Sequence, residues 1–242
     1  MKSDRFQFKQ FTIHQDRCAM KVGTDGVLLG AWAKGGKRIL DIGTGTGLIA
    51  LMMAQRYPDA QVWGIDIDAD ACQQATENIE RSRFNGQVFI RHSSLQAFLS
   101  PFPPQANRID EGLFDSIVSN PPYYINSLKA PDGKRTWARH ADTLPSCDLF
   151  DGIRRLLANE GTFSVIVPTD RMDDLLTEGY LHHFYPSRKY LVKTTPTKQA
   201  KRCLLAFQKQ RPTNMEEATV NMMDAPMEKS EWYRNLTEDF YL

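Results

Sequence analysis

Cysteine is scarce in this sequence, and its spacing excludes disulfide frameworks and structural zinc sites. The four cysteines among 242 residues stand far apart, at Cys18, Cys72, Cys147 and Cys203. Both kinds of scaffold need closely spaced ligands, which neither these cysteines nor the five dispersed histidines provide. We therefore expect free thiols in a reducing cytoplasm and no bound metal.

Long apolar runs and an excess of one charge are also missing. Glycines and charged residues interrupt every apolar stretch, so none reaches the roughly 20 residues that cross a bilayer. The N-terminus lacks the apolar centre of a secretory signal. Lysine and arginine number 30 against 29 acidic residues, a formal net charge of +1. The sequence thus predicts a cytoplasmic protein without a membrane partner, in which any polyanion site must come from local clusters of basic residues.

From residue 37 onward, apolar periodicity predicts strands that alternate with helices. The predicted strands are 38–42, 62–67, 87–91, 114–119 and 162–167. The predicted helices are 48–56, 70–83, 148–158 and 172–182, with Asp68 or Asp70 able to cap the second. Such alternation is typical of an α/β fold with a doubly wound, mostly parallel sheet. Two more strands, 188–195 and 202–208, follow without a helix and predict a C-terminal antiparallel hairpin at one edge.

The two ends of the chain differ from this regular centre. Apolar and polar residues alternate between Phe6 and Ile13, which predicts an extended or hairpin arm. The last residues are rich in methionine and acidic side chains. We expect an N-terminal arm or cap (1–36), a core domain (37–210) and a C-terminal tail packed on it (211–242). Whether the arm covers a ligand or completes the sheet edge is left open by the sequence.

A glycine-rich loop follows the first predicted strand, at residues 41–47 (Asp-Ile-Gly-Thr-Gly-Thr-Gly). Glycines let a backbone turn tightly and approach a ligand, and open α/β sheets bind ligands beyond the carboxyl ends of strands. The spacing does not fit the G-x-G-x-x-G of dinucleotide enzymes. Asp66 ends the second strand, where an acidic side chain can accept ribose hydroxyls. Two carboxylates without a phosphate-binding group favour a cationic nucleoside such as S-adenosylmethionine, although Asp41 could simply cap the loop.

A second motif, Asn-Pro-Pro-Tyr at residues 120–123, follows the fourth predicted strand. The prolines fix the backbone and remove amide donors, so carbonyl acceptors remain. Asn120 adds a side-chain acceptor, and Tyr123 adds a flat face on which a base could stack. A planar amine is a poor nucleophile; acceptors at Asn120 and Pro121 would orient it and stabilise positive charge during attack. The motif fits adenine, cytosine and glutamine amines alike.

Together these residues resemble a known family. Residues 41–47 with Asp66 resemble the first two motifs of class I methyltransferases, and residues 120–123 resemble the motif of methyltransferases that act on planar amines. Residues 8–11 and 15–32, with residues 120–124, 138–140 and 239–242, are similar to the bacterial tRNA1(Val) adenine-N6 methyltransferases. The resemblance implies a Rossmann-like class I fold, S-adenosylmethionine as cofactor, and methylation of the adenine 3′ to the anticodon of tRNA-Val.

The resemblance also implies site residues. Asp41 would contact the methionine end of the cofactor and Asp66 the ribose; where the family often has an acidic residue for the adenine amine, this chain has Ser94 and Leu95. The candidate cofactor-binding residues are Asp41, Gly43, Gly45, Gly47, Asp66, Ile67, Ser94, Leu95 and Asn120. The candidate catalytic residues are Asn120, Pro121, Pro122 and Tyr123.

Basic residues gather near the catalytic motif and near the last hairpin. The candidate RNA-binding residues are Lys129, Arg135, Arg139, Lys198, Lys201 and Arg202. Basic side chains beside a base pocket suit a single-stranded loop, and an unpaired anticodon-loop adenine needs no extraction from a duplex. Solvated charged faces are the alternative for both clusters. We expect tRNA as the partner and no obligatory protein partner.

Other functions share parts of this pattern. Protein glutamine methyltransferases acting on release factors share the Asn-Pro-Pro-Tyr motif, but they normally carry a helical N-terminal domain, and residues 1–36 are too few to form one. An adenine methyltransferase acting on ribosomal RNA or DNA would use the same chemistry. A non-catalytic nucleotide-binding domain is disfavoured because both motifs are intact.

Overall fold

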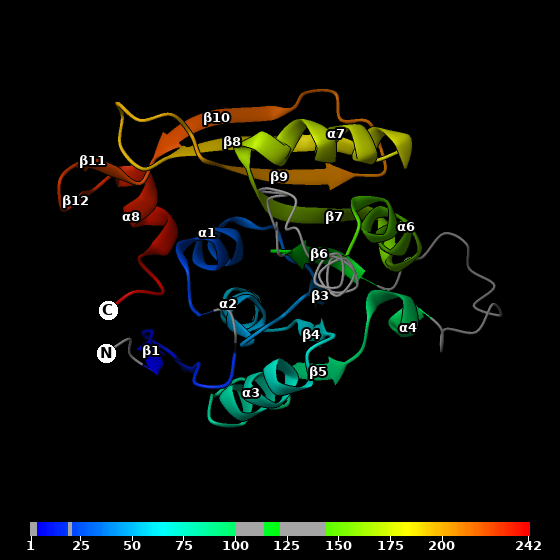
Figure 1. Ribbon diagram of the computed structural model, residues 1–242, viewed down its shortest axis with the longest axis vertical. Coiled ribbons are helices and arrows are strands. Elements are labelled where there is room, and N and C mark those ends of the chain that lie inside the picture. The colour runs from blue at the N-terminus through cyan, green and yellow to red at the C-terminus, as the bar shows by residue number, and fades with distance from the viewer. Residues whose placement is uncertain (1–3, 19–20, 100–113, 122–143) are drawn as a thin grey trace, which may run out of the picture.

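A computed structural model describes residues 4–18, 21–99, 114–121 and 144–242. Among these residues, eight strands form one sheet in the order β10-β8-β9-β7-β6-β3-β4-β5, with helices on both faces (Figure 1). This arrangement confirms the predicted α/β fold with a mostly parallel sheet. No helix in the described part of the chain is long and apolar enough to cross a membrane.

The sheet is parallel through its central strands. The strand β3 (Arg38–Ile42) pairs in parallel with β4 (Gln61–Asp66) and β6 (Phe114–Ser119), and β5 (Val88–His92) and β7 (Leu157–Pro168) extend the sheet on either side. Alternate side chains of a strand point to opposite faces, so Ile39 and Leu40, both fully buried, enter different hydrophobic cores.

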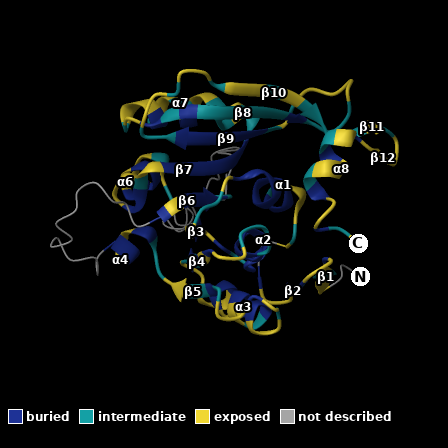
Figure 2. Ribbon diagram, turned by 180° about the vertical axis from the view of Figure 1, so that it is seen from behind, coloured by how far each residue is buried: buried dark blue, intermediate teal, exposed yellow. Residues whose placement is uncertain are grey.

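The predicted hairpin is present, but the sheet continues beyond it. The strand β9 (Arg202–Gln208) is antiparallel to both β7 and β8 (Tyr185–Lys193). The strand β10 (Glu216–Asn221) then pairs in parallel with β8 and is largely exposed, whereas β9 is buried (Figure 2). The boundary expected at residue 210 therefore does not coincide with the edge of the sheet.

Helices cover each face of the sheet. One core lies under α1 (Thr24–Trp32), α2 (Leu48–Arg56), α3 (Ala69–Glu80) and α8 (Glu231–Thr237). The other lies under α4 (Leu95–Leu99), α6 (Ser146–Leu156) and α7 (Met172–Leu181), which follows a short 3-10 turn at Thr169–Arg171. The predicted cap of α3 is confirmed at Asp68, whose side chain accepts from the backbone amides of Asp70 and Ala71.

The N-terminal arm is a separate hairpin that does not join the main sheet. Its strands β1 (Arg5–Gln7) and β2 (Thr12–His14) pair only with each other among the described residues. The arm packs on the end of the chain, where Phe8 stacks on Tyr241 with ring centroids 5.9 Å apart. A small hairpin of β11 (Met223–Ala225) and β12 (Glu228–Lys229) precedes α8. The arm thus does not complete the edge of the sheet, one of the two possibilities left open above.

Candidate active site

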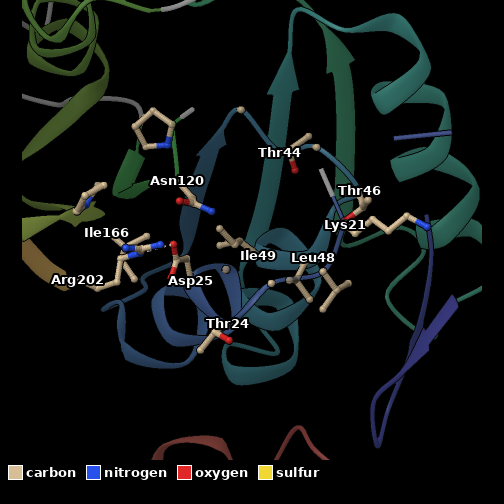
Figure 3. Close-up of a pocket in the computed structure, with 17 residues that line it drawn as sticks. Lys21, Thr24, Asp25, Thr44, Thr46, Leu48, Ile49, Asn120, Ile166 and Arg202 are labelled. Carbon is tan, nitrogen blue, oxygen red and sulfur yellow. Dashed lines mark hydrogen bonds and ion pairs between the residues drawn. The ribbon is translucent and has the colours of Figure 1, made fainter. Parts of the chain in front are cut away.

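A cavity of about 490 Å³ lies at the carboxyl edge of the sheet, beside the ends of β3 and β6. Its walls come from residues 21–26, the glycine loop at 43–46, the start of α2, Asn120 with Pro121, the end of β7 and Arg202 (Figure 3). The glycine loop and the first half of the Asn-Pro-Pro-Tyr motif therefore face one shared space.

Backbone conformation explains the three glycines of the loop. Gly43, Gly45 and Gly47 have φ of +74°, +55° and +80°, in the left-handed region that side chains rarely tolerate. A Cβ at Gly43 or Gly45 would meet nothing within 4 Å, whereas one at Gly47 would lie 3.3 Å from Ala75 Cβ. The first two glycines thus leave room on the cavity side, and the third lets α2 approach α3.

Asp41 lies behind the loop rather than in the cavity wall. It is fully buried, and Thr44 Oγ1 donates to its Oδ2 over 2.8 Å. Burial raises the pKa of Asp41 to about 7, and the Asp66 carboxylate adds to the increase, while the Thr44 hydrogen bond opposes it. Thr44 itself lines the cavity. Asp41 is therefore linked to the cavity wall by its hydrogen bond with Thr44. A direct contact between Asp41 and the methionine end of the cofactor stays a prediction.

Asp66 connects the loop to the neighbouring strand. Its Oδ2 accepts from the Gly45 amide over 2.8 Å, and its Oδ1 accepts from the Asp68 amide over 3.0 Å. Each carboxylate oxygen keeps a further lone pair, so the half-buried group can still accept from a diol. Next to it, the apolar side chain of Ile67 is 51% exposed. An exposed aliphatic surface beside a ribose acceptor suits the face of a nucleobase.

Ser94 and Leu95 follow β5 on the same edge of the sheet. The Ser94 hydroxyl accepts from the Ala97 amide over 3.1 Å and so caps α4. Leu95 is buried in the core. Neither residue lines the 490 Å³ cavity, nor do Asp66 and Ile67. The expected adenosine contacts thus lie outside the lining of this cavity, and the Ser94 hydroxyl already caps α4.

Asn120 is positioned by the strand that precedes it. Ser119 Oγ donates to the Ile42 carbonyl over 2.9 Å and ties the end of β6 to that of β3. Asn120 and Pro121 line the cavity directly afterwards. Pro122 and Tyr123 lie outside the described residues, as do Lys129, Arg135 and Arg139. Of the remaining basic candidates, Lys198 and Lys201 are exposed, and Arg202 lines the cavity.

The segment 21–26 forms a further part of the cavity wall. Gly23 is the N-cap residue of α1, and no side chain caps this helix. Thr24 and Asp25 line the cavity, and Asp25 Oδ2 pairs with Arg202 Nε at 2.6 Å. Asp25 thus pairs with β9 instead of capping its own helix. Ile166 and Pro168 were not predicted as site residues; their position at the carboxyl end of a parallel strand is the signal that could have found them.

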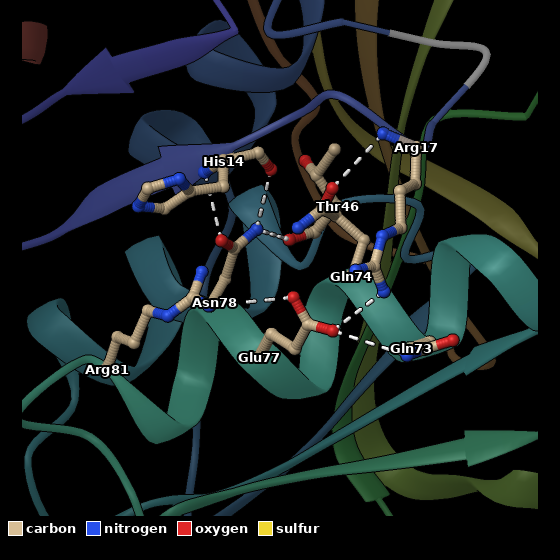
Figure 4. A network of polar contacts seen from close by, with 8 residues as sticks. All are labelled: His14, Arg17, Thr46, Gln73, Gln74, Glu77, Asn78 and Arg81. Atoms are coloured by element: carbon tan, nitrogen blue, oxygen red, sulfur yellow. Dashed lines mark hydrogen bonds and ion pairs between the residues drawn. The ribbon is translucent and has the colours of Figure 1, made fainter.

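A buried amide holds the N-terminal arm against the glycine loop. Asn78 Nδ2 donates to the carbonyls of His14 (2.9 Å) and Thr46 (3.0 Å), and Asn78 Oδ1 accepts from the His14 amide over 2.9 Å (Figure 4). Beside it, Gln74 Oε1 accepts from the Arg17 amide over 3.2 Å. These bonds place the arm, α3 and the loop in one polar network next to the cavity.

Known proteins resemble this chain in sequence and in fold. The family model of the methyltransferase small domain matches residues 21–141. A tRNA1(Val) (adenine(37)-N6)-methyltransferase of Bacteroides thetaiotaomicron is 44% identical over 245 positions, covering 100% of this chain and 99% of that protein. A protein of the same name from Trichodesmium erythraeum is 40% identical over 247 positions, with the same coverage. A solved structure of a predicted O-methyltransferase from Agrobacterium tumefaciens has a TM-score of 0.68 at 17% identity, covering 89% of this chain and 96% of that one.

Proposed function

Since the chain belongs to the tRNA1(Val) (adenine(37)-N6)-methyltransferase family, we propose that it methylates the exocyclic amine of the adenine 3′ to the anticodon of tRNA-Val, with S-adenosylmethionine as methyl donor. The observation that carries the chemistry is the shared cavity. Asn120 and Pro121 face the same space as the glycine loop, so an amine and a cofactor methyl can meet there.

The residues around the loop fit the cofactor. Gly43 and Gly45 leave space where side chains would intrude, Asp66 offers a half-buried carboxylate to a ribose, and Ile67 offers an apolar surface beside it. S-adenosylmethionine supplies a methyl group made electrophilic by its sulfonium. Burial raises the pKa of Asp41 to about 7, and a cationic ligand beyond the loop would favour its ionised form, so the two charges would stabilise each other.

Asn120 and Pro121 would act on the acceptor. The Asn120 side-chain oxygen and the Pro121 carbonyl would each accept one amine hydrogen, which holds the nitrogen in line and stabilises the positive charge that develops on it. The amine proton would leave after transfer, so no general base of raised pKa is needed. Ser119 fixes the strand end that carries both groups.

The tRNA anticodon loop would approach from the side of the last hairpin. Lys198 and Lys201 are exposed in the turn between β8 and β9, next to Arg202 in the cavity wall. Lysine side chains at that position can pair with backbone phosphates while an unpaired adenine enters the cavity.

Labelled S-adenosylmethionine with unmodified tRNA-Val transcripts tests this function. We expect label in adenine, none when the target adenine is replaced by guanine, and at least about a hundredfold lower kcat for Asn120→Ala, since one oriented acceptor is lost from the transition state. Asn120→Ala should still bind S-adenosylmethionine. Label in a release factor but in no tRNA would overturn the proposal in favour of a glutamine methyltransferase.

A further inference from the structure

The cavity wall away from the glycine loop carries an ion pair between distant parts of the chain. Asp25, in the first turn of α1, pairs its Oδ2 with Nε of Arg202, the first residue of β9, at 2.6 Å. Both side chains line the same cavity as Asn120 (Figure 3). Neither has a role in the function proposed so far beyond a general attraction of Arg202 for RNA.

Strand order places this pair on the acceptor side of Asn120. Across the sheet, β3 with its glycine loop is followed by β6, then β7, then β9. Asn120 directly follows β6, Pro168 ends β7, and Arg202 pairs directly with Pro168 at the start of β9. A base whose amine meets Asn120 with the cofactor on the β3 side must therefore extend toward β7 and β9, where Arg202 lies.

The guanidinium is held in place but keeps donors to spare. Besides the Asp25 contact, Arg202 Nη1 donates to the Lys201 carbonyl over 3.0 Å. A guanidinium has five N–H donors, so these two bonds leave three. The Arg202 side chain is 39% exposed and the Asp25 side chain 34%. An ion pair with this much exposure to solvent contributes little to the stability of the fold. Its clearer effect is to fix the plane of the guanidinium at the cavity wall.

Adenine needs a donor at this place. Acceptors at Asn120 and Pro121 would bind the amine hydrogens of any planar amine, whereas adenine carries acceptor nitrogens, N1 and N7, on both sides of its amine. The β7 wall offers little to them. Pro168 has no amide hydrogen, and Ile166 is apolar and paired with Leu204 within the sheet.

We propose that Arg202, held in its orientation by Asp25, donates a hydrogen bond to a ring nitrogen beside the reacting amine of the target adenine. Arg202 is then a specificity-determining residue and Asp25 a positioning residue. This inference rests on the proposed function, because it requires an adenine in the cavity.

The test compares full-length tRNA-Val carrying adenosine, 1-deazaadenosine or 7-deazaadenosine at the target position. With the unsubstituted protein, one deaza substitution should lower kcat/KM about 10- to 100-fold, the effect of a hydrogen bond to a charged donor. Arg202→Ala should lower kcat/KM by a similar factor on adenosine but show no further loss on that same analogue, because both changes remove one interaction. Asp25→Ala should show a smaller loss with the same non-additivity and an unchanged KM for S-adenosylmethionine.

Arg234→Ala, at an exposed position of α8, is the matched control and should behave like the unsubstituted protein with all three RNAs. Additive losses with both analogues in Arg202→Ala would overturn the proposal. If Arg202 instead contacts a phosphate, the variant would also bind tRNA with a weaker dependence on salt concentration. If it contacts the carboxylate of the cofactor, the variant would bind S-adenosylmethionine more weakly. Melting curves check that each variant folds. If Arg202→Ala does not fold, the Asp25→Ala variant provides the same test. Absence of methylation of natural tRNA-Val by the unsubstituted protein would instead refute the proposed function.

Discussion

At the scale of single residues, the glycine loop shows backbone conformation shaping the candidate cofactor site. Gly43 and Gly45 share positive φ with Gly47, but only Gly47 is confined by a neighbour, Ala75. A side chain at either of the first two would be strained in its backbone and would also project into open space at the cavity wall. Backbone strain and occlusion of the cavity are separate effects. Gly86, which also has a positive φ, allows them to be measured separately.

Gly45→Ala should weaken S-adenosylmethionine binding and destabilise the fold. The left-handed conformation costs an alanine about 1 kcal/mol, so the free energy of unfolding should fall by that amount. The added methyl group occupies the cavity surface, so Kd for the cofactor should rise about tenfold, a loss of about 1.4 kcal/mol. Isothermal titration calorimetry and denaturant unfolding measure the two quantities.

Gly86→Ala is the matched control for this experiment. Gly86 has φ of +89° and an equally open Cβ position, but it does not line the cavity. It should lose similar stability and keep the cofactor Kd unchanged. Equal weakening of cofactor binding in both variants would mean that Gly45 acts through stability alone and would contradict the proposed cofactor site.

At the scale of elements, α3 links the N-terminal arm to the glycine loop. Asn78 is fully buried and bonds both the His14 backbone and the Thr46 carbonyl. Gln15, the residue after His14, connects the arm to segment 21–26: its Oε1 accepts from the Val22 amide over 2.7 Å, and Val22 lines the cavity. Two walls of the cavity therefore depend on one helix face.

Asn78→Asp should disturb both walls while nearly keeping the side-chain shape. The aspartate would lose the donor and set a buried acceptor against the two carbonyl oxygens, which costs about 2–3 kcal/mol of unfolding free energy. With the loop and segment 21–26 less firmly held, KM for S-adenosylmethionine should rise more than kcat falls. Thermal melting and steady-state kinetics with tRNA-Val provide the measurements.

Asn235→Asp makes the same chemical change at an exposed position of α8, outside this network, and should leave both values nearly unchanged. A variant at Asn78 that melts lower but keeps the KM for the cofactor would show that the network supports the fold without positioning the cavity.

The elements differ in how well their sequences predict them. The strands β3, β4 and β6 are buried on both faces, so continuous apolar runs identify them, and the position of Asn120 beside the glycine loop follows from parallel topology. The strand β10 lies partly exposed at an edge, and Ala218 and Val220 are its only apolar residues, so its apolar signal is weak. The Asp25–Arg202 pair joins residues 177 positions apart, and no local pattern predicts such a contact.

The whole molecule has a net charge of only +1, although the proposed partner, tRNA, is a polyanion. The turn between β8 and β9 carries Lys198 and Lys201 in exposed positions at the carboxyl edge of the sheet. Arg211, also exposed, follows the opposite end of β9. The proposed RNA approach thus predicts that position on the surface, rather than total charge, decides how a lost cation affects tRNA binding.

The double variant Lys198→Ala/Lys201→Ala should bind tRNA-Val more weakly and with a shallower dependence on salt. Each lost phosphate contact lowers the slope of log K against log salt concentration by about 0.7–0.9, so the pair should lower it by about 1.4–1.8. Filter binding between 50 and 200 mM salt, as an approximate working range, gives this slope. The cofactor Kd should not change, because neither lysine lines the cavity. The double variant Arg211→Ala/Arg234→Ala removes the same charge and should leave the slope unchanged; equal slopes for the two double variants would place the RNA on another surface.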